Sequence, residues 1–171
     1  MKNLVVPIAA LILVALVGCG PSAEQKKMVA DLTTEVTSMM NDAKSSLGDL
    51  DKAAGDITTS LSGADSLMMK YPKGTEAING AVTQLKSAKD RLMSVKDNVS
   101  SWINAYKAPD LTKMKFDQVI ADLKKNKDEL TTATSEIKGA LSAASAAIDG
   151  YKNVASTLMS KVAAKTPMKK K

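Results

Sequence analysis

The sequence predicts an all-α protein, built as an elongated antiparallel three-helix bundle with coiled-coil character. Apolar residues recur at steps of three and four through three long segments, and the alternation typical of strands is absent. Two short turns that contain proline separate the segments. Hydrophobic residues make up 44% of the chain but aromatic residues only 3%. The core must therefore be built from aliphatic side chains and alanine, which suit packed helices.

The first helix is expected over residues 23–70. Ser22 and Gln25 have the spacing of a capping box, in which each side chain accepts a hydrogen bond from the backbone N–H of the other residue. Steps of four, four and three within this segment favour a straighter helix than a coiled coil. Its apolar stripe comprises Met28, Leu32, Val36, Met39, Ala43, Leu47, Leu50, Ala54, Ile57, Leu61, Ala64 and Met68.

The second helix is expected over residues 76–107. The segment before it, KYPKGT, combines a proline with a glycine and offers Thr75 as the N-cap. Its apolar residues are spaced alternately three and four positions apart throughout, as in a left-handed supercoil. The stripe comprises Ile78, Ala81, Leu85, Ala88, Leu92, Val95, Val99, Trp102 and Tyr106.

The third helix is expected over residues 111–165. In the segment KAPD, Pro109 ends the second helix and Asp110 can cap the third. Two polar residues, Lys127 and Thr134, fall on the stripe, and we expect them to fix the register or to reach a solvated layer. The stripe comprises Phe116, Ile120, Leu123, Lys127, Leu130, Thr134, Ile137, Leu141, Ala144, Ile148, Tyr151, Ala155, Leu158 and Val162.

Three stripes joined by two short turns can meet around one seam, which gives an up-down-up bundle. At the helical rise the three segments would be about 70, 48 and 80 Å long, so part of the first or third should extend beyond the second. The alternative is a four-helix arrangement, in which a long helix breaks and folds back near Gly63, Gly139 or Gly150.

The formal charge of +6 is concentrated at the two ends of the chain. Five of the 24 basic residues lie in the leader or near the C-terminal end, which leaves 19 basic against 18 acidic residues in the body. Because the body is nearly neutral, we expect no nucleic-acid partner. The five are Lys2, Lys165, Lys169, Lys170 and Lys171.

Residues 1–18 have the features of an export signal peptide. A lysine at position 2 precedes an apolar run over residues 4–16, which is too short to span a bilayer, since that takes about 20 residues. The segment Leu16-Val17-Gly18-Cys19 then resembles the lipobox of bacterial lipoproteins, with a branched residue three positions before the cysteine and a small residue just before it.

The resemblance implies that the leader is removed before Cys19, that the thiol carries a diacylglycerol, and that the new amino group is acylated, with palmitate as a typical chain. A lone thiol suits this role because no second cysteine is present for a disulfide. Each buried methylene contributes about 0.8 kcal/mol, so two or more chains anchor stably. Residues 19–22 would then link the lipid to the bundle.

The resemblance also implies a place in the cell envelope. In enteric-type cells an aspartate after the lipidated cysteine commonly retains a lipoprotein at the inner membrane, and this chain has Gly20 there. For a Gram-negative cell we therefore expect the outer membrane, facing the periplasm.

We expect no enzyme, no metal site and no cofactor besides the lipid. The chain has no histidine, and its one cysteine is assigned to lipid. The neighbouring acids Asp49 and Asp51, and likewise Asp128 and Glu129, are expected on solvent-facing helix surfaces. Residues 49–56 only partly match a calcium-binding loop and keep the helical stripe.

Trp102, Tyr106 and Phe116 bracket the turn at Pro109. We expect these large side chains to close one end of the bundle as part of its core. The alternatives are a small pocket or an interfacial contact.

The chain ends in a basic tail, residues 166–171, which is expected to be disordered. Lys169, Lys170 and Lys171 are candidates for a contact with the cell wall or with anionic lipid. Murein (Braun-type) lipoproteins are similar in combining a lipobox, a heptad helix and a C-terminal lysine joined to peptidoglycan. They are single short helices that trimerise, whereas this chain supplies three helices and ends in three lysines. The likeness is therefore one of architecture.

Two functions follow from these features. The favoured one is a lipid-anchored rod with a structural, spacer or protein-interaction role, whose partners are the membrane and an envelope protein or peptidoglycan. The alternative is a periplasmic binding module for a lipid, a hydrophobic peptide or a protein client. The sequence leaves the oligomeric state open.

Overall fold

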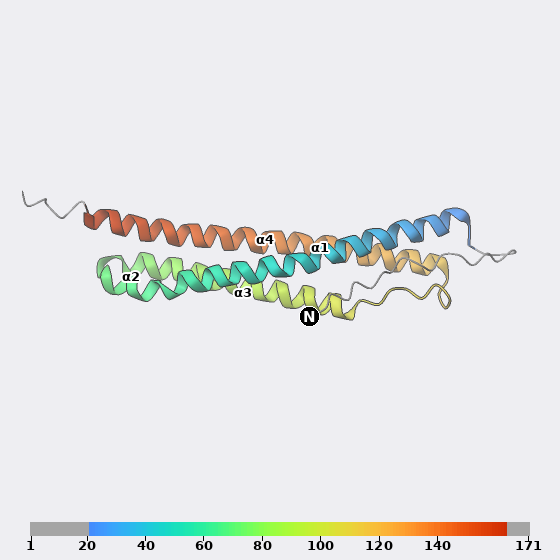
Figure 1. Ribbon diagram of the computed structural model, residues 1–171, viewed down its shortest axis with the longest axis horizontal. Coiled ribbons are helices and arrows are strands. Elements are labelled where there is room, and N and C mark those ends of the chain that lie inside the picture. Colours follow the sequence, from blue (N-terminus) through green and yellow to red (C-terminus); the bar gives the residue numbers. More distant parts are fainter. Residues whose placement is uncertain (1–20, 164–171) are drawn as a thin grey trace, which may run out of the picture.

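The computed structural model describes residues 21–163, and the leader, Cys19 and the tail lysines lie outside this range. Its helices are α1 (Ala23–Ser62), α2 (Ala64–Lys70), the short 3₁₀ helix η1 (Pro72–Gly74), α3 (Thr75–Ala105) and α4 (Phe116–Ala163). The three long helices pack against one another in up-down-up order and form a rod (Figure 1). The predicted all-α three-helix bundle is confirmed.

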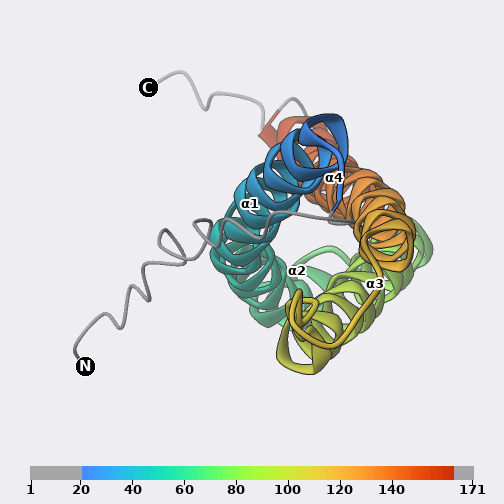
Figure 2. The ribbon, with the colours of Figure 1, turned by 90° about the vertical axis from the view of Figure 1, so that its right-hand side faces the viewer.

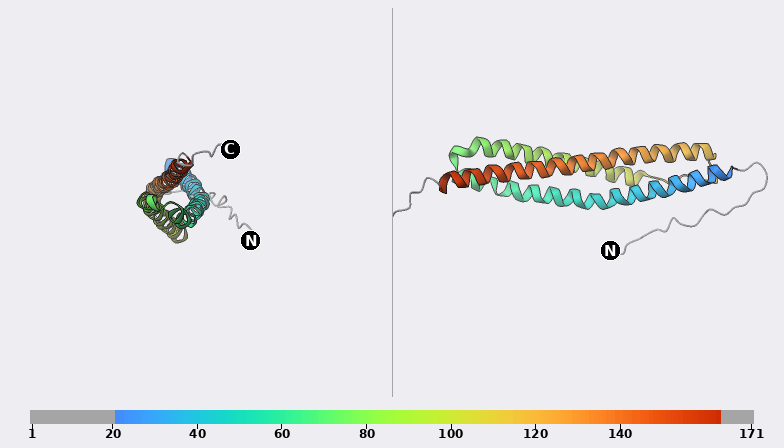
Figure 3. Two further views of the ribbon diagram at one scale, coloured as in Figure 1. Left: turned by 90° about the vertical axis from the view of Figure 1, so that its left-hand side faces the viewer. Right: turned by 90° about the horizontal axis from the view of Figure 1, so that it is seen from above.

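The rod has two different ends. α1 and α4 both begin at the end that carries residues 106–115, which we term the loop end (Figure 1). α2, η1 and the last turns of α4 lie at the opposite end, which we term the turn end (Figure 1). Figure 2 looks along the rod from the loop end, and the left panel of Figure 3 looks along it from the turn end.

The start of α1 is the predicted capping box. The backbone N–H of Gln25 donates to Ser22 Oγ at 3.1 Å, and the backbone N–H of Ser22 donates to Gln25 Oε1 at 2.9 Å. Two of the N–H groups that a helix start leaves without a partner are thereby satisfied.

The core is an apolar seam that follows the three predicted stripes. Of the 24 buried hydrophobic residues in the described part of the chain, 18 come from the stripes, and no buried residue there is polar or charged. Each helix must face two others, so its buried strip is wider than a single heptad seam. This explains five buried residues next to the stripes that the pattern missed, namely Val29, Met40, Val119, Ala140 and Ala147.

The first expected helix breaks where its composition is weakest for a helix, at Gly63. Gly63 keeps an ordinary right-handed conformation, with φ −84° and ψ −15°, and the seven residues of α2 cover the turn end without folding back along the rod. α4 runs without interruption through Gly139 and Gly150. The four-helix alternative is therefore wrong for the described residues.

Two helix starts differ from the prediction. Thr75 is the first residue of α3 and not its N-cap, because its hydroxyl instead donates to the Pro72 carbonyl at 2.9 Å. α4 begins at Phe116 and not at residue 111, because Asp110 caps a separate turn before it.

The unequal lengths have the predicted effect. α1, α3 and α4 have 40, 31 and 48 residues, or about 60, 46 and 72 Å at the helical rise. At the loop end α1 and α4 extend past the end of α3, and residues 106–115 run along this exposed stretch (Figure 1).

Candidate functional site

The residues predicted to carry function attach to opposite ends of the rod. Cys19 precedes the first residue of α1 by four positions, so it joins the chain at the loop end. The segment with Lys169, Lys170 and Lys171 follows α4, which ends at Ala163 at the turn end (Figure 1). α4 alone separates the two ends by about 72 Å. The predicted lipid site and the predicted tail contact thus belong to two different sites.

Three of the five aromatic side chains, those of Trp102, Tyr106 and Phe116, lie near the loop end, as the sequence predicts. The rings of Trp102 and Tyr106 stack with their centroids 5.3 Å apart, and both pack half-buried against the core. Trp102 Nε1 donates to Glu129 Oε2 at 2.7 Å, which ties α3 to α4. Burial raises the pKa of the Tyr106 hydroxyl. Phe116 packs against the same core from the start of α4, and all three side chains are partly buried.

Residues 106–115 hold a turn that Asp110 organises. Its Oδ1 accepts from the Thr112 hydroxyl at 2.6 Å and from the Thr112 backbone N–H at 3.0 Å, and Lys113 Nζ lies 3.2 Å from Oδ2. These hydrogen bonds lower the pKa of the Asp110 carboxyl, with the Thr112 side chain as the largest cause. Leu111 and Met114 pack against the core, so the loop continues the apolar seam beyond α3.

The two polar stripe residues of α4 have local roles. Lys127 Nζ lies 2.6 Å from Glu35 Oε2 on α1, with both side chains about half exposed. The Thr134 hydroxyl donates to the Leu130 carbonyl at 2.8 Å within its own helix. Both satisfy their polar groups at the edge of the seam, and Lys127 adds a cross-helix tie.

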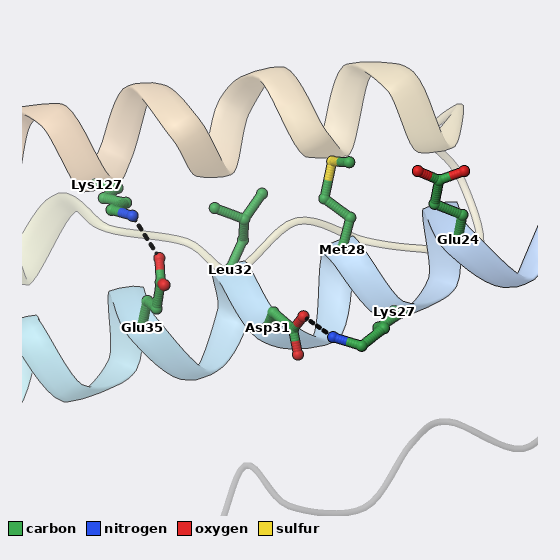
Figure 4. Close-up of a pocket in the computed structure, with 7 residues that line it drawn as sticks. All are labelled: Glu24, Lys27, Met28, Asp31, Leu32, Glu35 and Lys127. Atoms are coloured by element: carbon green, nitrogen blue, oxygen red, sulfur yellow. Dashed lines mark hydrogen bonds and ion pairs between the residues drawn. The ribbon is translucent and has the colours of Figure 1, made fainter.

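An open hollow lies between α1 and α4 beside this ion pair (Figure 4). Its volume is about 340 Å³, and Met28 and Leu32 form its apolar part. Its charged groups are largely paired, since Lys127 contacts Glu35 and Lys27 Nζ lies 2.6 Å from Asp31. A hollow with paired charges and an apolar floor offers surface for weak contacts and no reactive group.

A second open hollow of about 340 Å³ lies where the loop meets the start of α4. It is lined by Lys107, Ala108, Pro109, Asp110, Met114, Asp122, Lys125 and Asn126. Like the first, it belongs to the loop end.

The acidic pairs are exposed, as the sequence predicts. Asp51 binds Lys96 on α3, and Glu129 binds Trp102, so both serve packing between helices. The segment 49–56 lies inside α1. Within residues 21–163 no group of three or more histidine, cysteine, aspartate or glutamate side chains is placed to hold a metal ion.

The sequence did not reveal which charged and polar side chains pair between helices. The structure adds Gln25 Nε2, which donates to Asp117 Oδ1 at 2.8 Å, to the pairs Asp51–Lys96 and Glu35–Lys127. Lys127 lies on the stripe of α4 and the other five residues flank a stripe, and this position is the one signal available beforehand. The identity of each partner depends on the relative sliding of the helices, which the stripes alone do not define.

Comparison of the chain with protein-family models, with curated proteins and with solved structures gave no significant match. Among the described residues, no helix combines the length and the apolar character needed to cross a membrane.

Proposed function

We propose that the protein is a lipid-anchored envelope protein whose helical rod acts as a spacer between a membrane and a second envelope component. The observation that carries this proposal is the opposite attachment of its two predicted contacts. The lipobox lies just before α1 at the loop end, and the basic tail follows α4 at the turn end (Figure 1).

The bundle has properties that suit a spacer. Its apolar seam is continuous from Val29 near the loop end to Ala147 near the turn end. Ties between helices, such as Trp102 to Glu129 and Lys127 to Glu35, oppose sliding of one helix along another. A rod of this kind holds its two ends about 70 Å apart.

Distance also favours one tail partner over the other. If Cys19 is lipidated, two residues separate it from the Ser22 cap, a span of at most about 10 Å. The loop end would then lie next to the membrane, and an upright rod would carry the tail far from it. Lys169, Lys170 and Lys171 would meet peptidoglycan more readily than the lipid of the same membrane.

The proposed location is the outer membrane of a Gram-negative cell, facing the periplasm, with diacylglycerol and an N-acyl chain on Cys19. The alternative role as a binding module has less support, because both hollows described above are open to solvent.

Metabolic labelling tests the anchor. Cells that express the full chain are grown with an alkyne fatty acid, and the protein is isolated and fractionated. The wild-type chain should take up label and stay with the membrane, whereas Cys19→Ser should take up none and become extractable without detergent. Val17→Ala is the matched control, because it changes a variable position of the lipobox. A mature wild-type chain without fatty acid would refute the proposal.

Cosedimentation with purified sacculi tests the wall contact. Wild-type protein should sediment with sacculi, and deletion of residues 167–171 should weaken this binding. The covalent form is tested on sacculi isolated from cells that express the protein, because after boiling in detergent only protein joined through Lys171 stays on the wall. Equal binding of the wild-type and deleted chains would exclude a contribution from the tail.

A further inference from the structure

One flank of α1 carries a row of evenly spaced acidic side chains. Glu35, Asp42, Asp49 and Asp56 follow one another at intervals of seven residues, so they lie along one side of the helix, and all four are exposed. The ion pair of Glu35 with Lys127 shows that this side is the one next to α4. The three aspartates form no ion pair in the described part of the chain, so their charges are available to a partner. We term this row the acidic flank.

The opposite side of α1, where it meets α3, is basic. Asp51 of α1 pairs with Lys96 of α3 across this boundary. Lys44 lies seven residues before Asp51, and Lys89 lies seven residues before Lys96, so both belong to the same boundary. Three lysines against one aspartate leave it positive, and we term Lys44, Lys89 and Lys96 the basic flank.

The two flanks match in position along the rod. α1 and α3 run in opposite directions and Asp51 is level with Lys96, so Lys89 is level with Thr58, seven residues beyond Asp51. Each of the three aspartates then lies two residues, or about 3 Å along the rod, from one lysine of the basic flank. The matched pairs are Asp42 with Lys44, Asp49 with Lys96 and Asp56 with Lys89.

The surface of α1 between the flanks leaves room for another helix. Gly48 and Gly55 are exposed there, and a Cβ built on either would meet no atom within 4 Å. Helices pack with their axes about 8–10 Å apart where the side chains between them are small. Lys52 is the one charged residue between them, and it lies three and four residues from Asp49 and Asp56, so its ammonium group can turn to the acidic flank.

We infer that this outer face of α1 is a contact between two copies of the chain, which stand parallel about a two-fold axis that runs along the rods. In this order the acidic flank of each α1 faces the basic flank of the other copy, and every matched pair forms twice. An antiparallel pair would set each flank against its own kind. The inference goes beyond the proposed function, because it uses neither the lipid nor the tail. Two rods anchored in one membrane would have the same parallel order.

Disulfide crosslinking tests the contact. The full chain, purified in detergent with micelles in excess over protein, is oxidised with one added cysteine at a time. Ser45→Cys and Thr59→Cys lie between the flanks, 14 residues or about 21 Å apart along α1. Ser94→Cys is the matched control. It is equally exposed and level with Ala53, but it lies more than half a turn of α3 away from Lys96.

Both test variants should form a disulfide-linked dimer, whereas the control should give no more dimer than the wild-type chain. A disulfide forms only where two Cα atoms come within about 7 Å, so each residue must meet its own copy. A parallel pair allows this at both positions. An antiparallel pair about one axis allows it at one height only.

Charge reversal tests the basis of the contact in the Thr59→Cys background. Asp42→Lys with Asp56→Lys makes two of the three matched pairs repulsive and should lower the yield of dimer about fivefold, since exposed ion pairs contribute modestly. Adding Lys44→Asp and Lys89→Asp to the same chain exchanges the signs of both pairs and should restore the yield. High salt should reduce the dimer of the wild-type charges and of the exchanged charges alike. Circular dichroism checks that each variant keeps its helices.

Three results would overturn the inference. Equal dimer from Thr59→Cys and Ser94→Cys would mean that the chains meet only by collision. Dimer from only one of Ser45→Cys and Thr59→Cys would exclude the parallel order. A yield that charge reversal leaves unchanged would exclude the two flanks as its cause. None of these results alters the labelling of Cys19 or the binding to sacculi, so the proposed function is tested separately.

Discussion

Lys127 of α4 and Glu35 of α1 form an ion pair, Nζ to Oε2 at 2.6 Å, at a position that the apolar pattern of α4 assigns to the core. A lysine can occupy such a position because its stem packs along the seam while its ammonium group reaches solvent. The pair links two helices that run in the same direction. It therefore opposes sliding of α1 along α4 more than it adds stability.

A double-mutant cycle measures this pair. Lys127→Ala, Glu35→Ala and the double variant should give a coupling free energy of about 0.5 kcal/mol, because both side chains are about half exposed. Chemical denaturation followed by circular dichroism supplies the four free energies of unfolding. The coupling should fall in high salt, and a coupling that salt does not change would contradict an ion pair at the solvent edge.

The hydrogen bond from Trp102 to Glu129 can be followed by tryptophan fluorescence, because Trp102 is the one tryptophan of the chain. Glu129→Ala should lower the free energy of unfolding by about 1 kcal/mol and shift the tryptophan emission. Glu129→Gln keeps an acceptor oxygen and should cost less. Glu136→Ala, an exposed glutamate further along α4, is the control and should change neither quantity.

The seam predicts a sharp contrast between two residues of α3. Leu85 is fully buried, so Leu85→Ala should lower the free energy of unfolding by about 3 kcal/mol through lost burial and a new cavity. Met93 is 50% exposed, and Met93→Ala should change it by less than about 0.5 kcal/mol. Thermal and chemical unfolding of both variants test this, and similar losses would place the core elsewhere.

Two glycines give opposite expectations for the same substitution. Gly80 lies within α3 with open space around the site of a Cβ, so Gly80→Ala should raise the free energy of unfolding by about 0.5–1 kcal/mol. A Cβ on Gly74 would lie 2.5 Å from Leu158 Cδ2, so the Leu158 side chain must move and Gly74→Ala should lower the free energy of unfolding by up to about 1 kcal/mol. Gly74→Ala should cost less in a Leu158→Ala background than in the wild-type chain, because the side chain that would collide with the new Cβ is then shortened. Stabilisation by Gly74→Ala would mean that η1 does not rest on α4.

The sequence predicts the helices well because their apolar stripes are long and because turns that contain proline separate them. Ile78 to Val99 of α3 are buried at each predicted position, since a surface helix can bury one face only. The misplaced start of α4 has a local cause. Asp110 can cap either a long helix or an isolated turn, and the choice depends on how Leu111 and Met114 pack on the core, which no local pattern contains.

The sequence predicts the two candidate sites but not the contacts between helices. The lipobox and the lysine tail are local motifs, so they can be recognised without a structure. The ion pair of Lys127 with Glu35 joins residues that are 92 positions apart, the difference between 127 and 35, so no local motif contains it.

The turn at Asp110 makes a prediction about acid titration. Hydrogen bonds from Thr112 and Lys113 favour the charged carboxylate, so the pKa of Asp110 lies below its ordinary value of 3.8. Because the folded pKa is the lower one, the support that Asp110 gives to the turn is complete above pH 3.8 and is lost as the pH falls through the folded pKa. Thr112→Val removes the hydroxyl donor, the largest cause, and should raise the Asp110 pKa towards 3.8 in an NMR titration of its carboxyl carbon. Lys113→Gln should raise it less, because the Lys113 contact contributes less than either hydrogen bond from Thr112. The reverse order of the two variants would assign the shift to charge and not to the Thr112 hydrogen bonds.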